Sequence, residues 1–134
     1  MDRRFLLAGA ALAALSVAAG AFGSHLLQGR LDLDQMTIFE IAVRYQMYHA
    51  LALLAVGLWM ERDPGRLVEF SGWLFLVGIL LFSGSLYVLV LTGASWLAAV
   101  TPLGGTSLLA GWICLAFAAA SRPRKSADTT HATR

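Results

Sequence analysis

Four apolar stretches, each long enough to cross a lipid bilayer, fill most of this 134-residue chain. The hydrocarbon core of a bilayer is about 30 Å thick, and a helix needs about 20 residues to cross it. We therefore predict an all-α integral membrane protein, in which four transmembrane helices form one bundle and one domain over residues 1–120. The polar residues 121–134 are predicted to be a disordered cytoplasmic tail. The four spans lie at about residues 5–24, 41–60, 70–91 and 96–120.

The composition supports this class of protein. Hydrophobic residues make up 58% of the chain and charged residues 13%, about half of the roughly 25% that is usual for soluble domains. A soluble domain of this length could not bury so much apolar surface. The net charge of +2 is small, and the basic residues flank the apolar stretches, so we expect no nucleic-acid partner. Cys114 is the one cysteine, which excludes an intrachain disulfide.

The positions of the basic residues predict the orientation in the membrane. Of the ten Lys and Arg residues, eight precede the first stretch, lie between the second and third, or follow the fourth. Arg30 and Arg44 lie on the other side of a four-span chain. Basic residues are enriched in cytoplasmic segments. We therefore expect both termini to lie in the cytoplasm.

The first apolar stretch has a second interpretation. Arg3 and Arg4 precede it, and the Ala-Gly-Ala sequence at 19–21 could be the cleavage site of a signal peptide. Since the stretch is long enough to span and three further spans follow, we expect it to be retained as a helix.

Small residues of the first stretch, spaced by three and four positions, predict close packing against a neighbouring helix. They are Gly9, Ala13, Ser16, Gly20 and Ser24.

The connection between the first and second stretches contains signals for helix ends. Gly29 can end the first helix, and Asp32 or Asp34 can cap the second. A continuous helix over residues 35–60 would be about 39 Å long at 1.5 Å per residue. That length exceeds the hydrocarbon thickness. We therefore predict an extended or interfacial helix that leads into span two.

The other two connections are short. The Asp-Pro-Gly sequence at 63–65 is typical of a tight turn between spans two and three, and spans three and four should be antiparallel neighbours. Span four has two possible starts. It can begin near Ser95 and bend at Pro102, or it can begin at Pro102 with Thr101 as the N-cap. We favour the second start, with the preceding residues forming a short interfacial piece.

Polar side chains gather near the external end of every span, whereas the cytoplasmic halves are almost entirely hydrocarbon. Ionisable residues at membrane depth are costly and mark functional candidates. Tyr45, Tyr48 and His49 share one helix face, and Glu40 lies one turn from Arg44 and can pair with it. We predict a polar layer at the external rim, centred on His49, that is either structural or ligand-binding. Its candidate residues are His25, Glu40, Arg44, Tyr45, Gln46, Tyr48, His49, Ser83, Tyr87, Thr101, Pro102, Gly104 and Gly105.

Three classes of function are considered. A non-enzymatic protein would use the layer as a packing clasp, or as a docking site for a membrane-protein partner or a second copy. The common depth expected for His49, Tyr87 and Thr101 favours this class. A small-solute carrier or channel subunit could attract anions with the free N–H groups of a helix that starts at Pro102, but no polar residues continue across the cytoplasmic half. A redox enzyme subunit would bind haem or quinone through His25 and His49, and their different depths argue against it.

Signatures of catalysis are missing from the sequence. His, Cys and carboxylate residues are not grouped at metal-ligand spacing, and neither a nucleophile–base pair nor a phosphate-binding glycine loop is present. We therefore predict no catalytic residue, no cofactor and no metal. The leading interpretation is a non-enzymatic integral membrane protein whose partners are the lipid bilayer and, as a further expectation, another membrane protein.

Four ordered motifs resemble one known family. They are Gly-Ala-Phe-Gly-Ser-His at 20–25, Arg-Tyr-Gln-Met-Tyr-His-Ala-Leu at 44–51, Phe-Ser-Gly-Ser-Leu-Tyr at 82–87 and Thr-Pro-Leu-Gly-Gly at 101–105. Together they resemble the YgdD/YwdK family of small four-helix bacterial inner-membrane proteins, a domain of unknown function with a transmembrane relative in animals. The resemblance implies an intact first span, a multi-pass protein of the bacterial cytoplasmic membrane and no assigned reaction.

The motif positions carry over onto numbered residues of this chain. Ser24 stands where many relatives have alanine, a small-for-small difference of little consequence. Naming the family supplies no mechanism, because a fold does not determine a function. The positions that the resemblance implies are Gly23, His25, Arg44, Tyr45, Gln46, His49, Ser83, Gly84, Tyr87, Thr101, Pro102, Gly104 and Gly105.

Overall fold

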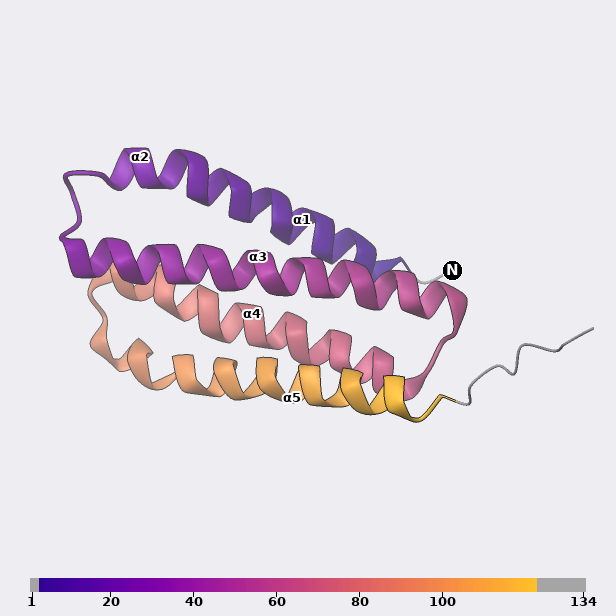
Figure 1. The fold of residues 1–134 in the computed structure, drawn as a ribbon. Helices are drawn as coiled ribbons and strands as arrows, with labels where there is room; N and C mark the ends of the chain where they lie inside the picture. The colour runs from indigo at the N-terminus through magenta and orange to yellow at the C-terminus, as the bar shows by residue number, and fades with distance from the viewer. Residues whose placement is uncertain (1–2, 123–134) are drawn as a thin grey trace, which may run out of the picture.

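A computed structural model describes residues 3–122, and in this part of the chain all regular structure is helical (Figure 1). A π-helical turn, Ala19–Gly23, joins α1 to α2, and a 3₁₀ helix, Ser95–Ala99, precedes α5. The α-helices are α1 (Arg4–Ala18), α2 (Ser24–Leu27), α3 (Leu33–Arg62), α4 (Arg66–Thr92) and α5 (Thr101–Ala120).

Four helical segments are long and apolar enough to cross a membrane. They contain 24, 30, 27 and 26 residues, and they are Arg4–Leu27, Leu33–Arg62, Arg66–Thr92 and Ser95–Ala120. The prediction of an all-α fold with four helices long and apolar enough to span a membrane is therefore confirmed for residues 3–122. The long helix predicted before span two is the first part of α3, which runs unbroken from Leu33. Most of the predicted tail, residues 123–134, lies outside the described residues.

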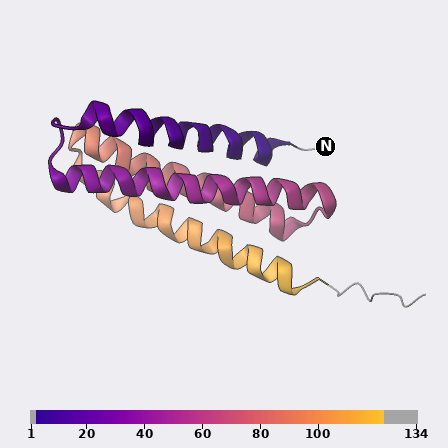
Figure 2. The same ribbon diagram turned by 45° about the horizontal axis from the view of Figure 1, so that its top comes forward.

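Consecutive spans are antiparallel, and the four spans lie side by side in the order of the sequence. The extensive contacts join α1 to α3, α3 to α4, and α4 to α5, so α1 and α5 lie at opposite edges of the molecule (Figures 1 and 2). We call the end that holds Arg4 and Arg122 the termini end. The opposite end, where Arg30 and Ser95 lie, is called the loop end.

The helix ends follow the local signals in the sequence. Asp32 caps α3, because its carboxylate accepts a hydrogen bond from the Gln35 backbone N–H (2.8 Å) and the Gln35 side chain bonds back to the Asp32 N–H (3.1 Å). This reciprocal pair is a capping box. Gly29 and Gly93 turn the chain with φ of 82° and 69°, a left-handed geometry that glycine adopts without steric cost. The turn predicted at 63–65 separates α3 from α4.

The start of span four corrects one detail of the prediction. A separate 3₁₀ helix does precede α5, as the favoured interpretation expected. However, Thr101 is the first residue of α5, Val100 occupies the N-cap position, and no side chain caps this helix end. The Thr101 hydroxyl lies instead 3.3 Å from the Leu97 carbonyl oxygen, one turn back. The Thr101 side chain, which was expected to cap α5, therefore contacts the preceding 3₁₀ helix instead.

The α1–α3 contact depends on small residues of α1, which confirms the predicted close packing. A Cβ atom on Gly9 would lie 2.8 Å from the Ala50 carbonyl oxygen. The Ser16 hydroxyl donates a 2.8 Å hydrogen bond to the Val43 carbonyl oxygen on α3. From the other side, the Gln46 side-chain amide donates a 2.8 Å bond to the Leu12 carbonyl oxygen.

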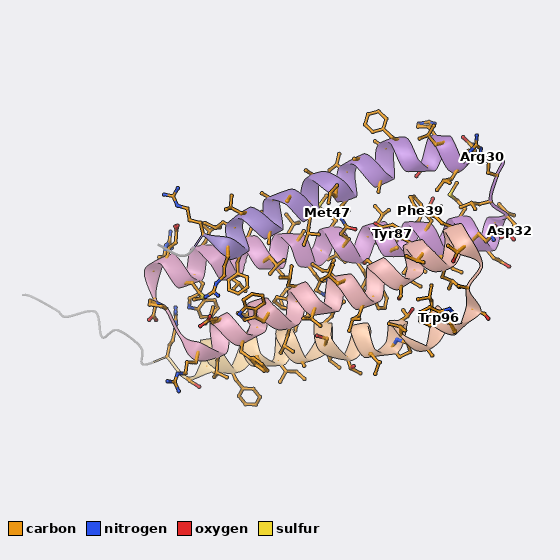
Figure 3. All side chains as sticks on the ribbon, turned by 180° about the vertical axis from the view of Figure 1, so that it is seen from behind. Arg30, Asp32, Phe39, Met47, Tyr87 and Trp96 are labelled. Atoms are coloured by element: carbon orange, nitrogen blue, oxygen red, sulfur yellow. The ribbon has the colours of Figure 1, made fainter. Side chains whose placement is uncertain are left out.

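The apolar core is concentrated toward the termini end of the molecule. Phe5, Leu53, Val56 and Phe75 are at most 2% exposed and belong to one buried cluster. At the termini end α1 also touches α4, because the Phe5 ring fills the space over Gly72. Toward the loop end α1 and α2 diverge from α3 (Figure 3). Most of the candidate polar residues lie toward this more open end, whereas His49 contacts the core residue Phe75.

Candidate functional site

His49 is buried in α3, with 5% of its surface exposed, and both of its ring nitrogens are hydrogen-bonded. Its Nδ1 lies 2.7 Å from the Tyr45 carbonyl oxygen, and its Nε2 lies 3.1 Å from the Trp112 indole nitrogen on α5. A carbonyl oxygen only accepts and an indole N–H only donates. The proton is therefore on Nδ1, Nε2 is the acceptor, and the imidazole is neutral.

This arrangement, called here the histidine clasp (His49, Tyr45 and Trp112), joins α3 to α5 across the row of helices. The ring centroid of His49 lies 6.0 Å from that of Tyr45, 6.0 Å from that of Trp112 and 5.7 Å from that of Phe75. The lone pair of Nε2 faces the indole N–H, so no ring nitrogen is left to bind a metal or haem iron. The clasp satisfies its own polar groups, which is typical of a structural element.

The histidine clasp does not lie at the external rim, which corrects the predicted common depth of His49, Tyr87 and Thr101. Trp112 is eleven residues beyond Thr101 on α5, a rise of about 16 Å at 1.5 Å per residue. His49 bonds to Trp112, whereas Thr101 contacts Ser85 near the loop end. The error arose because depth was counted from Arg44, whereas α3 begins at Leu33, eleven residues earlier.

Thr101 belongs to a second polar contact, between α4 and α5. Its hydroxyl oxygen lies 2.8 Å from that of Ser85, which also donates to the Phe82 carbonyl oxygen at 3.0 Å. One turn further, Gly104 lies directly against the backbone of Phe82. Pro102 is exposed in the first turn of α5. These residues bring α4 and α5 together.

Tyr87 is one of the lining residues of a groove bounded by α1, α3 and α4. Its ring centroid is 5.5 Å from that of Phe39 (Figure 3), and its hydroxyl is buried without a hydrogen-bond partner among the described residues. The Ser83 hydroxyl, one turn away, is buried and unpartnered as well. The groove has a volume of about 370 Å³. We call it the α1–α4 groove, and Leu12, Leu15, Phe39, Gln46, Leu80 and Tyr87 are among its lining residues.

A second groove lies on the other side of the α1–α3 contact. It has a volume of about 400 Å³ and holds the charged candidates of α3. The predicted ion pair between Glu40 and Arg44 is not formed: within residues 3–122, neither side chain has a partner. An exposed pair one turn apart gains only about 0.3–0.5 kcal/mol, too little to fix two long side chains. We call this site the α1–α3 groove, and Ser16, Gly20, Ser24, Glu40, Arg44 and Tyr48 are among its lining residues.

The two histidines do not form a site together. His25 is exposed on the short helix α2 and lines a hollow at the loop end with Asp32 and Glu40. His49 is buried between α3 and α5, and its nitrogens are occupied. In the part of the chain that the structure describes, no group of three or more His, Cys, Asp or Glu residues could hold a metal ion.

Sequence reasoning missed Trp112 as the partner of His49. A signal was present, because tryptophan in membrane proteins is usually found at the two interfaces, whereas Trp112 lies in the middle of α5. An indole N–H away from water needs an acceptor. The π-helical turn at 19–23 was also missed. Such turns are frequent at functional sites, and this one includes Gly20, which lines the α1–α3 groove.

Comparison with known proteins shows similarity across most of the chain. The model of a family described as protein of unknown function, DUF423, matches residues 19–105. A UPF0382 membrane protein of Staphylococcus haemolyticus is 44% identical over 111 residues, which cover 83% of this chain and 90% of that protein. The UPF0382 membrane protein YwdK of Bacillus subtilis is 43% identical over 116 residues, covering 86% and 94% respectively. No solved structure matches.

Proposed function

Because this chain belongs to the DUF423 family of proteins of unknown function, whose relatives are named membrane proteins, we propose that it docks a membrane-protein partner in the α1–α4 groove. It does so as a non-enzymatic protein of the bacterial cytoplasmic membrane. The buried imidazole, which is the strongest candidate for chemistry, has both nitrogens occupied in the histidine clasp. Binding, and not catalysis, is the activity that this geometry supports.

The observation that carries the proposal is the unpartnered hydroxyl of Tyr87. Buried polar groups are almost always hydrogen-bonded, and leaving one unpaired costs about 1–3 kcal/mol. Tyr87 is one of the lining residues of a groove that is otherwise largely apolar, and its hydroxyl is buried behind the groove surface, where a small side-chain rotation would expose it. A lipid tail would fill the groove without supplying an acceptor. A partner helix would supply both an apolar side chain and a polar group for Tyr87.

Photocrosslinking in native membranes tests the groove directly. We expect benzoylphenylalanine in place of Leu80, which lines the groove, to give one discrete protein adduct. The same substitution at Leu109 on α5 is the matched control, because both leucines are 61% exposed. Tyr87→Phe should reduce the adduct at position 80 about five-fold, the factor that corresponds to one hydrogen bond of about 1 kcal/mol.

The thermal midpoint of Tyr87→Phe in detergent separates binding from stability. Because the hydroxyl has no partner among residues 3–122, its removal should leave the melting temperature unchanged or raise it, since an unpaired buried group is destabilising. Equal protein adducts at positions 80 and 109, or an adduct that survives Tyr87→Phe undiminished, would refute docking in this groove.

The proposed orientation places the termini end in the cytoplasm. It is supported by the basic residues, because eight of the ten Lys and Arg residues lie before or at the start of α1, at the two helix ends that the α3–α4 turn joins, or after α5 in the sequence. Basic segments are retained on the cytoplasmic side. Arg30 is the one basic residue in the connections at the loop end, and Arg44 lies on α3 below it.

Two conservative cysteine substitutions test this orientation in a Cys114→Ala background. Ser95 lies at the loop end and Ser121 at the termini end, and both are exposed. A membrane-impermeant maleimide applied to intact spheroplasts should label Ser95→Cys at least about ten times more than Ser121→Cys, since lipid excludes the reagent. Permeabilisation should make the labelling equal. Stronger labelling of Ser121→Cys than of Ser95→Cys in intact spheroplasts would show that the topology is the reverse of the one proposed.

A further inference from the structure

Glu40 and Arg44 are two opposite charges that share one groove without pairing. Both side chains are exposed, and both lie on the face of α3 that lines the α1–α3 groove. Neither has a hydrogen bond or ion pair with any other residue from 3 to 122. Ionisable side chains near membrane depth are expensive and usually have an identifiable partner. Residues 3–122 supply no partner for either charge, so we look for one outside the protein.

The two charges lie at the depth of lipid headgroups. Eighteen residues separate Arg44 from Arg62 at the termini end of α3, a rise of about 27 Å at 1.5 Å per residue. The hydrocarbon core is about 30 Å thick. Arg44 therefore sits at the outer edge of the hydrocarbon, and Glu40 lies one turn further out. Ser24 in the opposite wall lies twenty residues from Arg4, and so reaches the same level.

The groove is a built cavity and not a flat helix face. Its inner wall is formed by Ser16 and Gly20, and the small size of these residues keeps the cavity open. The wall is fixed in place, because the Ser16 hydroxyl bonds to the Val43 carbonyl oxygen of α3 at 2.8 Å. The π-helical turn begins beside it at Ala19. A volume of about 400 Å³ accepts a compact polar group together with the first atoms of a chain.

We propose that the α1–α3 groove binds the headgroup of a zwitterionic phospholipid that carries a primary ammonium, phosphatidylethanolamine. The planar guanidinium of Arg44 suits a phosphate, which it can bind with two parallel hydrogen bonds. The carboxylate of Glu40 accepts from the ammonium N–H groups. A purely anionic headgroup would meet the repulsion of Glu40, and a choline headgroup has no N–H to donate.

The occupant of this groove is separate from the partner proposed for the α1–α4 groove. The line of contact between α1 and α3, with the Ser16–Val43 and Gln46–Leu12 hydrogen bonds, lies between the two grooves. A lipid in one groove and a helix in the other can bind at the same time. Failure of the photocrosslinking experiment would leave the lipid proposal intact, and the converse also holds.

The test measures which phospholipids remain bound to the purified full-length chain. The protein is reconstituted in nanodiscs with equal amounts of phosphatidylethanolamine, phosphatidylcholine and phosphatidylglycerol, extracted in mild detergent and analysed by native mass spectrometry. We expect phosphatidylethanolamine to be retained about ten-fold over each of the others, a factor that corresponds to about 1.4 kcal/mol. Glu40→Gln and Arg44→Gln should each abolish this preference.

Glu61→Gln and Arg62→Gln are the matched controls, because this exposed charged pair lies on the same helix at the termini end. They should retain the wild-type preference. Melting temperatures of all four variants should match, since none of the four side chains is buried. Equal retention of the three lipids, equal loss in the control variants, or a lipid-free dimer that Arg44→Gln dissociates would overturn the proposal.

Discussion

Gly104→Ala is expected to lower the free energy of unfolding in detergent by about 3 kcal/mol, the upper end of the usual cost of overpacking. A Cβ atom at this position would overlap the backbone nitrogen of Phe82 and lie 2.7 Å from the backbone carbon of Leu81. A backbone cannot rotate aside as a flexible side chain does. The α4–α5 pair, which has the most extensive helix contact in the molecule, would have to separate.

The adjacent glycine is the control for this effect. A Cβ atom on Gly105 would meet the Phe82 ring at 3.7 Å, which is ordinary van der Waals contact. Since alanine is the better helix former by about 0.5–1 kcal/mol, Gly105→Ala should be neutral or slightly stabilising. Thermal and chemical unfolding of the two variants, measured in the same micelles, decides the matter. Equal stability would mean that the helices do not approach as closely as described.

His49→Leu is expected to lower the free energy of unfolding by about 2–3 kcal/mol. Leucine has a similar size, but it leaves the Trp112 indole N–H without an acceptor in an apolar surrounding. An unsatisfied polar group of this kind costs about 1–3 kcal/mol, and the contact with Tyr45 is lost as well. An unchanged melting temperature would show that the histidine clasp does not stabilise the fold.

A double-mutant cycle separates the hydrogen bond from the packing of the rings. Trp112→Phe removes the indole donor and leaves Nε2 of His49 unpaired. Because the double variant leaves neither partner unpaired, it should be more stable than the sum of the two single effects predicts, by about 1–2 kcal/mol. Additive losses would instead assign the effect to packing alone.

The architecture could be predicted from the sequence because each element carries its own local signal. The apolar length of each span, the capping residue Asp32 and the turn residues at Gly29 and 63–65 act over a few neighbouring positions. The π-helical turn at 19–23 has no such signal. In this turn Gly20 and Gly23 pack against α3. That packing is a property of the folded chain and leaves no local signal in the sequence.

The candidate polar residues were found individually, but their grouping was not predictable. Counting residues gives depth only from the true end of a helix, and α3 begins at Leu33, eleven residues before the Arg44 from which depth was counted. His49 therefore contacts Trp112 and not Thr101, and the predicted single layer divides into the histidine clasp, the α4–α5 contact and two grooves. Glu40 and Arg44 satisfied the spacing rule for an ion pair, yet the gain from an exposed pair is too small to hold them together.

The sequential row of helices has a consequence for biosynthesis. Each span packs chiefly on the span that precedes it in the chain, so every newly inserted segment meets a neighbour that has already left the ribosome. Contacts between segments near in sequence form quickly and need little chain closure. The bond from Trp112 back to His49 crosses over α4. This hydrogen bond can form only after the last segment has been inserted, so its formation marks the completion of membrane insertion.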